Sequence, residues 1–278
     1  MVWTEYNFMS QSRNWSGTSP APAADNPHKL IQTSWLSGGA QYFFNEDWGL
    51  SVVVPSANRV LRQESGHGDH GHGQGHGHGG HADEQGGANT IRWWGMGDVR
   101  VNAYYTGFSS DMSTGFNLGV KIPSGDWTQP GVSRDNQIGT GSTDILFGFY
   151  HRHRITPDAR WMWYVNAQLD APVITQAGYT PGLQLGATAG AYYSGLKVGS
   201  LKIRPIAQAI FTNRASDSGP EADPRNTGYQ QLSLSPGVEF DLHPLRLYTD
   251  IEFPVLNNVV GNQLMAPATV RVILGYLF

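Results

Sequence analysis

The residues of this chain that are best suited to binding a metal lie in one histidine-rich segment. Between Gly66 and His81 the histidines alternate with glycine, aspartate and glutamine, and the segment holds no large apolar side chain. The imidazoles are those of His67, His70, His72, His76, His78 and His81. Imidazole is a good ligand for Zn, Cu and Ni, and glycine spacers let several rings converge on one ion. The segment therefore predicts binding of a divalent transition metal, Cu, Ni or Zn, with no cofactor required by the rest of the chain.

A second interpretation of this segment is a hydrophilic surface loop without a metal function. A stretch with no apolar side chains cannot offset the entropy of ordering by burial, so we expect a long outer loop at about 63–89. Without a fixed geometry, metal selectivity would follow the intrinsic order, with Cu and Ni ahead of Zn. Both interpretations stay open at the level of sequence.

Charged side chains of both signs share one face of the predicted strands and could line a pore. The residues expected to line it are Asp98, Arg100, Lys121, Asp144, Arg204, Arg246, Asp250 and Glu252. Other charged residues expected on that face are Glu5, Arg13, Arg92, Arg152, Arg154, Asp170, Lys202, Glu239 and Arg271. They could pair across the bore as a rigid polar core, or form a constriction that selects solutes. Asp98 and Arg100, beside a glycine-rich element, are the pair we would test first as a constriction.

An enzymatic function finds little support in the sequence. Acyl transfer by a serine needs a histidine within reach of both the serine and an acid. Outside the histidine-rich segment the histidines are His28, His151, His153 and His243, and no convincing catalytic set includes them. We predict that the chain is not an enzyme, although a lipid-modifying outer-membrane barrel remains the alternative in that class.

The C-terminal residues indicate what kind of element positions these side chains. From Thr269 to Phe278 one face is continuously apolar and ends in two aromatics, whereas the other is polar or small with one charge, Arg271. This is the pattern of a transmembrane β-strand with lipid outside and a lumen inside. The chain has 278 residues with 35 Gly and only 14% charged residues, and no apolar run long enough for a transmembrane helix. Zero Cys excludes disulfides and thiolate metal sites, and the net charge of −4 argues against a nucleic-acid partner.

Alternation of period two recurs along the whole chain. In 245–257, Leu245, Leu247 and Ile251 face one way, and Arg246 and Asp250 face the other. We predict an all-β fold, a transmembrane antiparallel β-barrel of about twelve strands in a single domain spanning 1–278. The expected strands are 3–15, 29–44, 47–62, 90–107, 113–124, 142–156, 160–172, 181–194, 200–213, 227–242, 245–257 and 265–278. The expected aromatic girdle comprises Trp48, Trp93, Tyr105, Trp161, Tyr193 and Tyr276.

The connections between these strands alternate in length. Tight turns are expected at 45–47, 109–112, 157–158 and 243–244, and longer connections at 16–28, 63–89, 125–141, 173–180, 214–226 and 258–264. Short periplasmic turns and long outer loops are the rule in outer-membrane barrels. An even strand count then places both termini in the periplasm.

Four internal motifs resemble one outer-membrane family. They are Leu50-Ser-Val-Val-Val-Pro55, Gly95-Met-Gly-Asp-Val-Arg100, Gly119-Val-Lys-Ile-Pro-Ser-Gly-Asp126 and Gly139-Thr-Gly-Ser-Thr-Asp-Ile145. In order and spacing they are similar to the recurring elements of the β-barrel family named for the meta-pathway of phenol degradation. The resemblance covers roughly residues 30–150. It implies a small barrel that transports hydrophobic or aromatic small molecules, with no catalytic residues.

We therefore predict an outer-membrane channel or transporter for small solutes in a Gram-negative bacterium, with aromatic or hydrophobic molecules as the candidate solutes. Surface capture of divalent metal through the histidine-rich loop is the alternative. The expected partners are the lipid bilayer, lipopolysaccharide and a small-molecule solute. The chain begins without a charged n-region or an apolar h-region, so we expect an export signal to have been removed.

Overall fold

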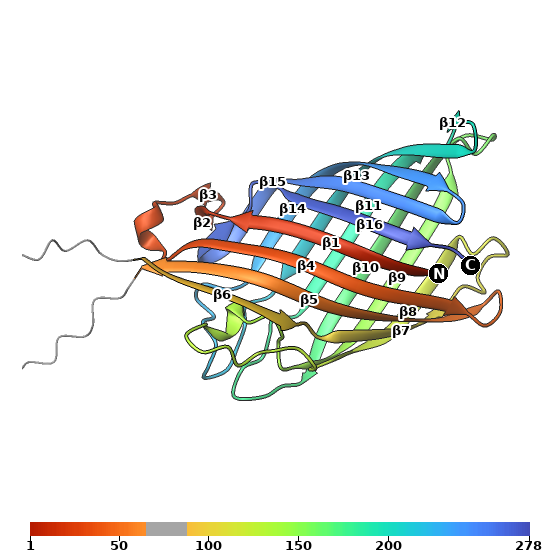
Figure 1. Cartoon of the computed structure of the whole chain (residues 1–278). Helices are drawn as coiled ribbons and strands as arrows, with labels where there is room; N and C mark the ends of the chain where they lie inside the picture. Colours follow the sequence, from red (N-terminus) through yellow and green to blue (C-terminus); the bar gives the residue numbers. More distant parts are fainter. Residues whose placement is uncertain (65–87) are drawn as a thin grey trace, which may run out of the picture.

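The protein is a closed antiparallel β-barrel of twelve wall strands, as the sequence predicts. The computed structural model describes residues 1–64 and 88–278. The chain follows an up-and-down order, and the first strand pairs with the last, Val2 opposite Tyr276 and Met9 opposite Thr269 (Figure 1). This pairing closes the barrel, and the wall strands of the described chain are hydrogen-bonded on both sides except along residues 88–96, which pair on one side alone.

The wall strands have these bounds: β1 Val2–Gln11, β4 His28–Phe43, β5 Trp48–Glu64, β6 Ala88–Met96 with β7 Val99–Tyr105, β8 Thr114–Ile122, β9 Thr143–Arg154, β10 Trp161–Ile174, β11 Gln184–Tyr193, β13 Leu201–Arg214, β14 Tyr229–Leu242, β15 Leu245–Met265 and β16 Thr269–Tyr276. Short strands β2 Arg13–Gly17, β3 Ser19–Pro20 and β12 Leu196–Val198 pair with the wall or with each other. Two 3-10 turns, η1 Ala23–Asp25 and η2 Arg134–Asn136, lie in the loops. No helix in the described part of the chain is long and apolar enough to cross a bilayer.

β6 and β7 act as one wall strand with an interruption at Gly97 and Asp98. β5 pairs with β6 through residues 56–64 and with β7 through residues 48–53. The sequence predicts a single strand over 90–107, and the structure breaks it where Asp98 turns away from the ladder. A break in one strand redirects a side chain, as β-bulges often do next to functional sites.

The last loop differs from the prediction. The expected connection at 258–264 is instead β-paired, because β15 extends to Met265. Val259 pairs with Tyr229, yet the carbonyl of Leu264 accepts a hydrogen bond from Gln11 at the barrel rim. The chain therefore rises, reverses near Gly261 and descends again, and the positive φ of 67° at Gly261 fits the reversal.

The two ends of the barrel differ in the length of their connections. The turn end carries both termini and the connections 44–47, 106–113, 155–160, 194–200 and 243–244 (Figure 1). The loop end carries 12–27, 123–142, 175–183, 215–228 and the reversal of β15, together with the last residue of β5 and the first of β6. This alternation matches the pattern expected from sequence.

Apolar side chains cover the outer face of the wall. On β5, Leu50, Val52 and Val54 are exposed, and on β15 so are Ile251 and Phe253. An aqueous protein would not leave such a continuous apolar band in contact with water. The band is the surface that a bilayer solvates.

The aromatic girdle is confirmed in part. Trp48 and Trp161 are exposed on the outer face, and they pack on Tyr105 and Tyr193 with ring centroids 4.8 Å and 5.0 Å apart. Tyr276 is likewise exposed. The prediction is wrong for Trp93, which is buried against Ile138 of loop 123–142.

Candidate functional site in the barrel interior

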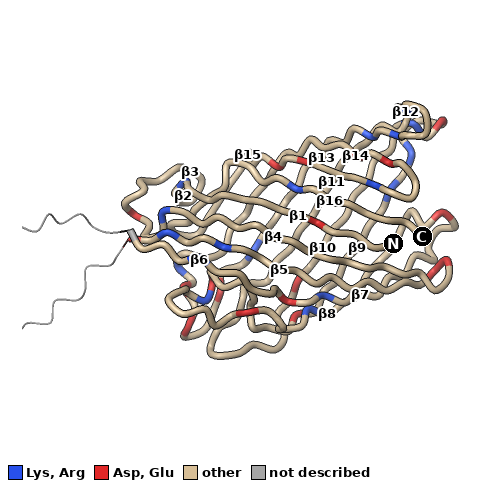
Figure 2. Tube along the Cα trace, viewed as in Figure 1, with Lys and Arg blue, Asp and Glu red and all other residues tan. Residues whose placement is uncertain are grey.

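The polar faces of the strands all turn inward. On β15, Leu245, Leu247 and Ile251 are exposed on the outer face, which places Arg246 and Asp250 inside the barrel. Seven of the eight residues expected to line a pore occupy inward positions of their strands, and the eighth, Asp98, lies in the break between β6 and β7. Charges of both signs follow the wall and gather at both ends (Figure 2).

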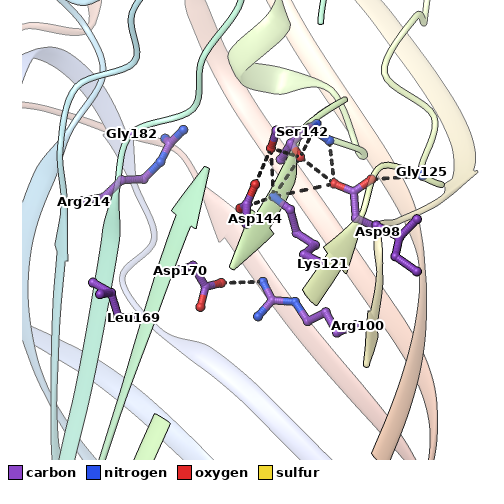
Figure 3. Close-up of polar contacts among 12 residues, drawn as sticks. Asp98, Arg100, Lys121, Gly125, Ser142, Asp144, Leu169, Asp170, Gly182 and Arg214 are labelled. Atoms are coloured by element: carbon purple, nitrogen blue, oxygen red, sulfur yellow. Dashed lines mark hydrogen bonds and ion pairs between the residues drawn. The ribbon is translucent and has the colours of Figure 1, made fainter. Parts of the chain in front are cut away.

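Three of these residues meet in a buried cluster, which we call the Lys121 cluster (Asp98, Lys121, Thr140, Ser142 and Asp144). Lys121 Nζ lies 2.5 Å from Asp144 Oδ2 and 3.9 Å from Asp98 Oδ2. It also donates to Thr140 Oγ1 at 2.8 Å and to Ser142 Oγ at 3.2 Å (Figure 3). The β8–β9 register places Lys121 directly opposite Asp144, and the break before β7 aims Asp98 at both. The ammonium group therefore has four oxygen-bearing neighbours in a site almost closed to solvent.

The Lys121 cluster fastens loop 123–142 to the wall. Asp98 Oδ1 accepts a hydrogen bond from the backbone N–H of Gly125 at 3.0 Å, and Oδ2 accepts one from that of Thr140 at 2.8 Å. The two arms of the loop are in close contact here, because a Cβ on Gly125 would lie 2.8 Å from Gly139 Cα. The glycines of both motifs thus allow one carboxylate to hold both arms.

The middle of this loop packs against inward-facing side chains of the wall. Ile138 belongs to a buried cluster with Leu61 of β5, Trp93 of β6 and Leu264 of β15. Arg59 Nη1 donates to the carbonyls of Asn136 and Gln137, at 2.7 and 3.2 Å. Loop 123–142 therefore narrows the barrel interior near the loop end.

This packing corrects two sequence predictions on β6. The sequence pattern places Trp93 on the lipid face and Arg92 in the lumen, whereas Trp93 is 7% exposed against Ile138 and Arg92 lies on the opposite face. The prediction therefore exchanges the inner and outer faces of β6. The apolar partner of Trp93 comes from a distant loop, so the sequence of β6 alone does not show that an apolar side chain can face inward.

Asp98 and Arg100, the two residues we would test first as a constriction, have different partners in the structure. Asp98 and Arg100 share the inward side but do not pair; Arg100 Nη2 lies 2.9 Å from Asp170 Oδ2 of β10 (Figure 3). The pair spans two intervening strands, and the Arg100 side chain is 40% exposed. Arg100 is therefore a solvated charge in the interior, whereas Asp98 is a buried anchor.

A second buried network, the Asp250 cluster, includes Gln208, Ser235, Tyr248, Asp250 and Arg271. Arg271 binds Asp250 through two parallel hydrogen bonds, of 2.9 Å from Nε and 2.8 Å from Nη2. Ser235 and Gln208 also donate to Asp250 Oδ2, at 2.5 and 3.2 Å. Gln208 in turn donates to the hydroxyl of Tyr248 at 2.9 Å. This network ties β13, β14, β15 and β16 together from the inside.

Near the turn end, charged residues surround a cavity of about 510 Å³. Arg204 forms ion pairs with Glu239 and, at 3.0 Å, with Asp241. Arg246 lies 3.8 Å from Glu239 and 3.6 Å from Asp241. Arg204, Glu239 and Arg246 line the cavity, so both arginines lie inside the barrel near the turn end.

The loops at the other end are joined by Arg134, Tyr179 and Asp217. The guanidinium of Arg134 lies over the rings of Trp127 and Tyr179, 4.4 and 4.8 Å from their centroids. The phenol of Tyr179 donates to Asp217 Oδ2 at 2.7 Å, and burial together with that carboxylate raises its pKa. Tyr179 therefore stays protonated and keeps its hydrogen bond at neutral pH. Three loops from distant parts of the sequence are held together here.

Sequence reasoning missed several of these residues. Arg59, Gln208, Ser235 and Asp217 are absent from the predicted set, although each is buried and hydrogen-bonded. Arg59 could have been found from the sequence. It lies an even number of residues after Ser51, so the alternation of β5 places both side chains on the inner face. For the others, a polar residue on an inward face is too common a feature to single out.

The six histidines of the metal prediction, from His67 to His81, lie outside the described residues. Within 1–64 and 88–278, no three histidine, aspartate or glutamate side chains form a group that could hold an ion. Glu64 pairs with Ala88, so β5 and β6 are paired up to the last described residue of β5 and the first of β6. Metal binding by this segment therefore stays a prediction.

We expect purified protein to bind Cu, Ni or Zn in calorimetry, and a variant lacking residues 66–81 to lose that binding while keeping its melting temperature. The reason is that the deletion removes the ligands and leaves β5, which ends at Glu64, and β6, which begins at Ala88, intact. Protons compete for the imidazole lone pairs near the unperturbed pKa of about 6.5, so affinity should fall steeply below about pH 6. Unchanged affinity in the deletion variant would assign the metal to another site.

Comparisons with known proteins agree on the fold. The sequence matches no protein-family model and no curated protein. Among solved structures, the COG4313 outer membrane channel from Pseudomonas putida F1 aligns with a TM-score of 0.65 and 9% identity, over 100% of this chain and 94% of that one. The β domain of the Bordetella autotransporter BrkA aligns with a TM-score of 0.56 and 12% identity, over 100% and 98%.

The chain has the fold of an outer-membrane β-barrel. The closed ladder, the apolar outer band and both structural neighbours agree on this point. At these identities the neighbours show the fold alone.

Proposed function

We propose that the protein is an outer-membrane channel for small solutes. The observation that carries the proposal is a barrel interior lined by charged side chains, with cavities near both ends. These cavities measure about 380 Å³ at the loop end and about 510 Å³ at the turn end. Charged side chains that line a pore are a common means of solute selection in channels. The COG4313 protein of Pseudomonas putida, which has the same fold, is an outer membrane channel, and this likeness also supports the proposal.

We further propose that the loop end faces the cell exterior and that both termini are periplasmic. Long loops outside and short turns inside are the rule in this class of membrane protein. Protease accessibility on whole cells tests the orientation: cleavage sites inserted in loop 215–228 should be cut, and sites inserted at turn 155–160 should be protected.

The resemblance to the family of the phenol meta-pathway extends the proposal to small aromatic solutes. Its motifs form the Lys121 cluster and the break before β7, so they shape the interior at its narrow part. Liposome swelling with a series of aromatic, sugar and amino-acid solutes tests both the channel function and the preference for aromatic solutes. No swelling with any solute and no conductance in planar bilayers would contradict the channel function.

A hydrolytic function is less well supported by the geometry. In the described residues, the imidazole hydrogen bond to a side chain joins His151 to Thr114, at 2.8 Å, and involves no serine or carboxylate. A nucleophile needs a base within hydrogen-bond reach. A lipase assay on the purified barrel, with phospholipid as substrate, should therefore show no turnover.

The Arg100–Asp170 pair offers a direct test of the channel. Arg100→Gln removes a positive charge and leaves the carboxylate of Asp170 without its partner, so the interior becomes more negative. We expect the ratio of cation to anion permeability in planar bilayers to rise by roughly twofold or more. Arg160→Gln is the matched control, since Arg160 pairs with Asp158 at an exposed turn. Equal permeability ratios in wild type and Arg100→Gln would show that ions do not pass Arg100.

A further inference from the structure

The cavity at the loop end has charges of opposite sign at its base and at its mouth. It measures about 380 Å³, near the lower limit of ligand cavities, which span about 300–1,000 Å³. Its wall comes from β1, β4, β5, β13, β14 and β15 and from loops 12–27, 123–142 and 215–228. We infer that it binds a small zwitterion, a molecule of amino-acid size with one carboxylate and one ammonium group. This inference rests on the proposed function, since the cavity would be the entry site of the channel.

The base of the cavity holds a buried guanidinium. Arg59 is 9% exposed; its Nε donates to Thr33 Oγ1 at 3.0 Å, and Nη1 donates to two loop carbonyls. No carboxylate of the described residues lies within 4.0 Å of it to form an ion pair. Asp135, which lines the same cavity, attracts the guanidinium only from a longer distance. A charge taken out of water is costly unless an opposite charge compensates it. A ligand carboxylate would supply that compensation with strong, charge-assisted hydrogen bonds.

Arg214 lines the same cavity but contributes less net charge. Its Nη2 lies 2.5 Å from Asp217 Oδ1, which is fully buried. The positive charge of Arg214 is therefore already neutralised inside the protein. Arg59 is therefore the cationic group at the base to which the carboxylate of a ligand would bind.

The mouth of the cavity is acidic. Asp25, Asp135 and Asp223 line it from three different loops, and all three side chains are exposed. None of them forms an ion pair with a described residue within 4.0 Å. A cationic group at the mouth would therefore be attracted, whereas an anion would be repelled before it reached Arg59.

These charges favour a zwitterion over either simple ion. A monovalent anion gains from Arg59 but passes three carboxylates, and a monovalent cation gains from the mouth but is opposed by Arg59. A molecule with its carboxylate inward and its ammonium outward gains from both. Specificity of this kind arises from penalising the wrong ligand as well as from attracting the right one.

Calorimetry with three probes on one carbon skeleton tests the inference. The probes are L-alanine, propionate, which lacks the ammonium, and L-alaninamide, which lacks the carboxylate; each is titrated at pH 7 into the full-length barrel in detergent. We expect saturable binding of alanine, about tenfold or more tighter than that of either analogue. Propionate binding as tightly as alanine would reduce the cavity to an anion site and overturn the inference. So would alaninamide binding as tightly, or no saturable binding of alanine.

Variants at the base and at the mouth separate the two contributions. Arg59→Gln should weaken alanine binding about tenfold or more, and Asp135→Asn should weaken it several-fold, because each removes one pole of the cavity. Asp135 is an exposed loop residue, so its variant keeps the test valid even if Arg59→Gln fails to fold. Arg62→Gln is the matched control: it lies on β5 but on the opposite face, away from the cavity, and should bind alanine as the wild type does. Equal alanine affinity in Asp135→Asn, Arg59→Gln and the wild type would also overturn the inference.

The failure of this inference is distinguishable from failure of the channel function. Conductance and swelling with an uncharged sugar report the channel, and calorimetry reports the cavity. A barrel that conducts but binds no alanine refutes the zwitterion site alone. A barrel that binds alanine but never conducts supports the site and refutes the channel.

Discussion

Replacing Lys121 by methionine is expected to destabilise the barrel by about 3–5 kcal/mol, the cost of removing one partner from a buried ion pair. The side chains of Lys121, Asp98 and Asp144 are 6%, 5% and 4% exposed. Without the ammonium group, two carboxylates remain buried close to each other. Loop 123–142 also loses its attachment, since the carboxylate that holds both of its arms is left uncompensated. Urea unfolding of the refolded barrel in lipid vesicles measures the free-energy change.

Lys29→Met is the matched control for this substitution. Lys29 Nζ lies 3.1 Å from Glu64 Oε1, but the two side chains are 18% and 61% exposed. Glu64 is exposed, so the ion pair itself contributes about 0–1 kcal/mol. The hydrogen bonds that Lys29 Nζ donates to the carbonyls of Ala23 and Asn26 add about 1 kcal/mol each at most. If Lys121→Met and Lys29→Met cost the same, then the Lys121 cluster does not stabilise the loop as its geometry indicates.

Replacing Asp250 by alanine is expected to have an effect of similar size, about 3–5 kcal/mol. The carboxylate is 1% exposed and accepts hydrogen bonds from Arg271, Ser235 and Gln208. Alanine leaves a guanidinium without its partner and two further donors unsatisfied. Because Arg271 lies on β16, which pairs with β1, the closure of the barrel should weaken first. The same unfolding measurement applies, together with the heat-dependent shift of the folded band in gel electrophoresis.

Glu252→Ala serves as the control on the same strand. Glu252 is two residues beyond Asp250 and faces the same way, but it forms no ion pair or side-chain hydrogen bond with a described residue. Its removal should change the free energy of unfolding by about 0.5 kcal/mol or less. A loss below about 1 kcal/mol in Asp250→Ala would mean that the network is dispensable.

The sequence by itself was sufficient to predict the wall of this barrel. Successive side chains of a strand point to opposite faces. A wall with lipid outside and a polar interior therefore requires apolar and polar residues to alternate along the sequence. This alternation, together with the turn residues between the strands, predicts twelve strands, their order and the alternation of short and long connections. It also predicts the inward position of Lys121, Asp144, Arg204 and Asp250. Each of these features depends on neighbours that lie close in the sequence.

Tertiary structure alone decided how the interior is connected. Arg100 pairs with Asp170 rather than Asp98 because the register of four strands brings them within 2.9 Å. Trp93 faces inward because loop 123–142 supplies Ile138 as an apolar partner inside the barrel. Arg59 and the carboxylates of three loops share one cavity only after the chain has closed. A local pattern reports which face of a strand is polar, but pairing across a closed barrel depends on strand register and on loop conformation, and neither is encoded in the period of a single segment.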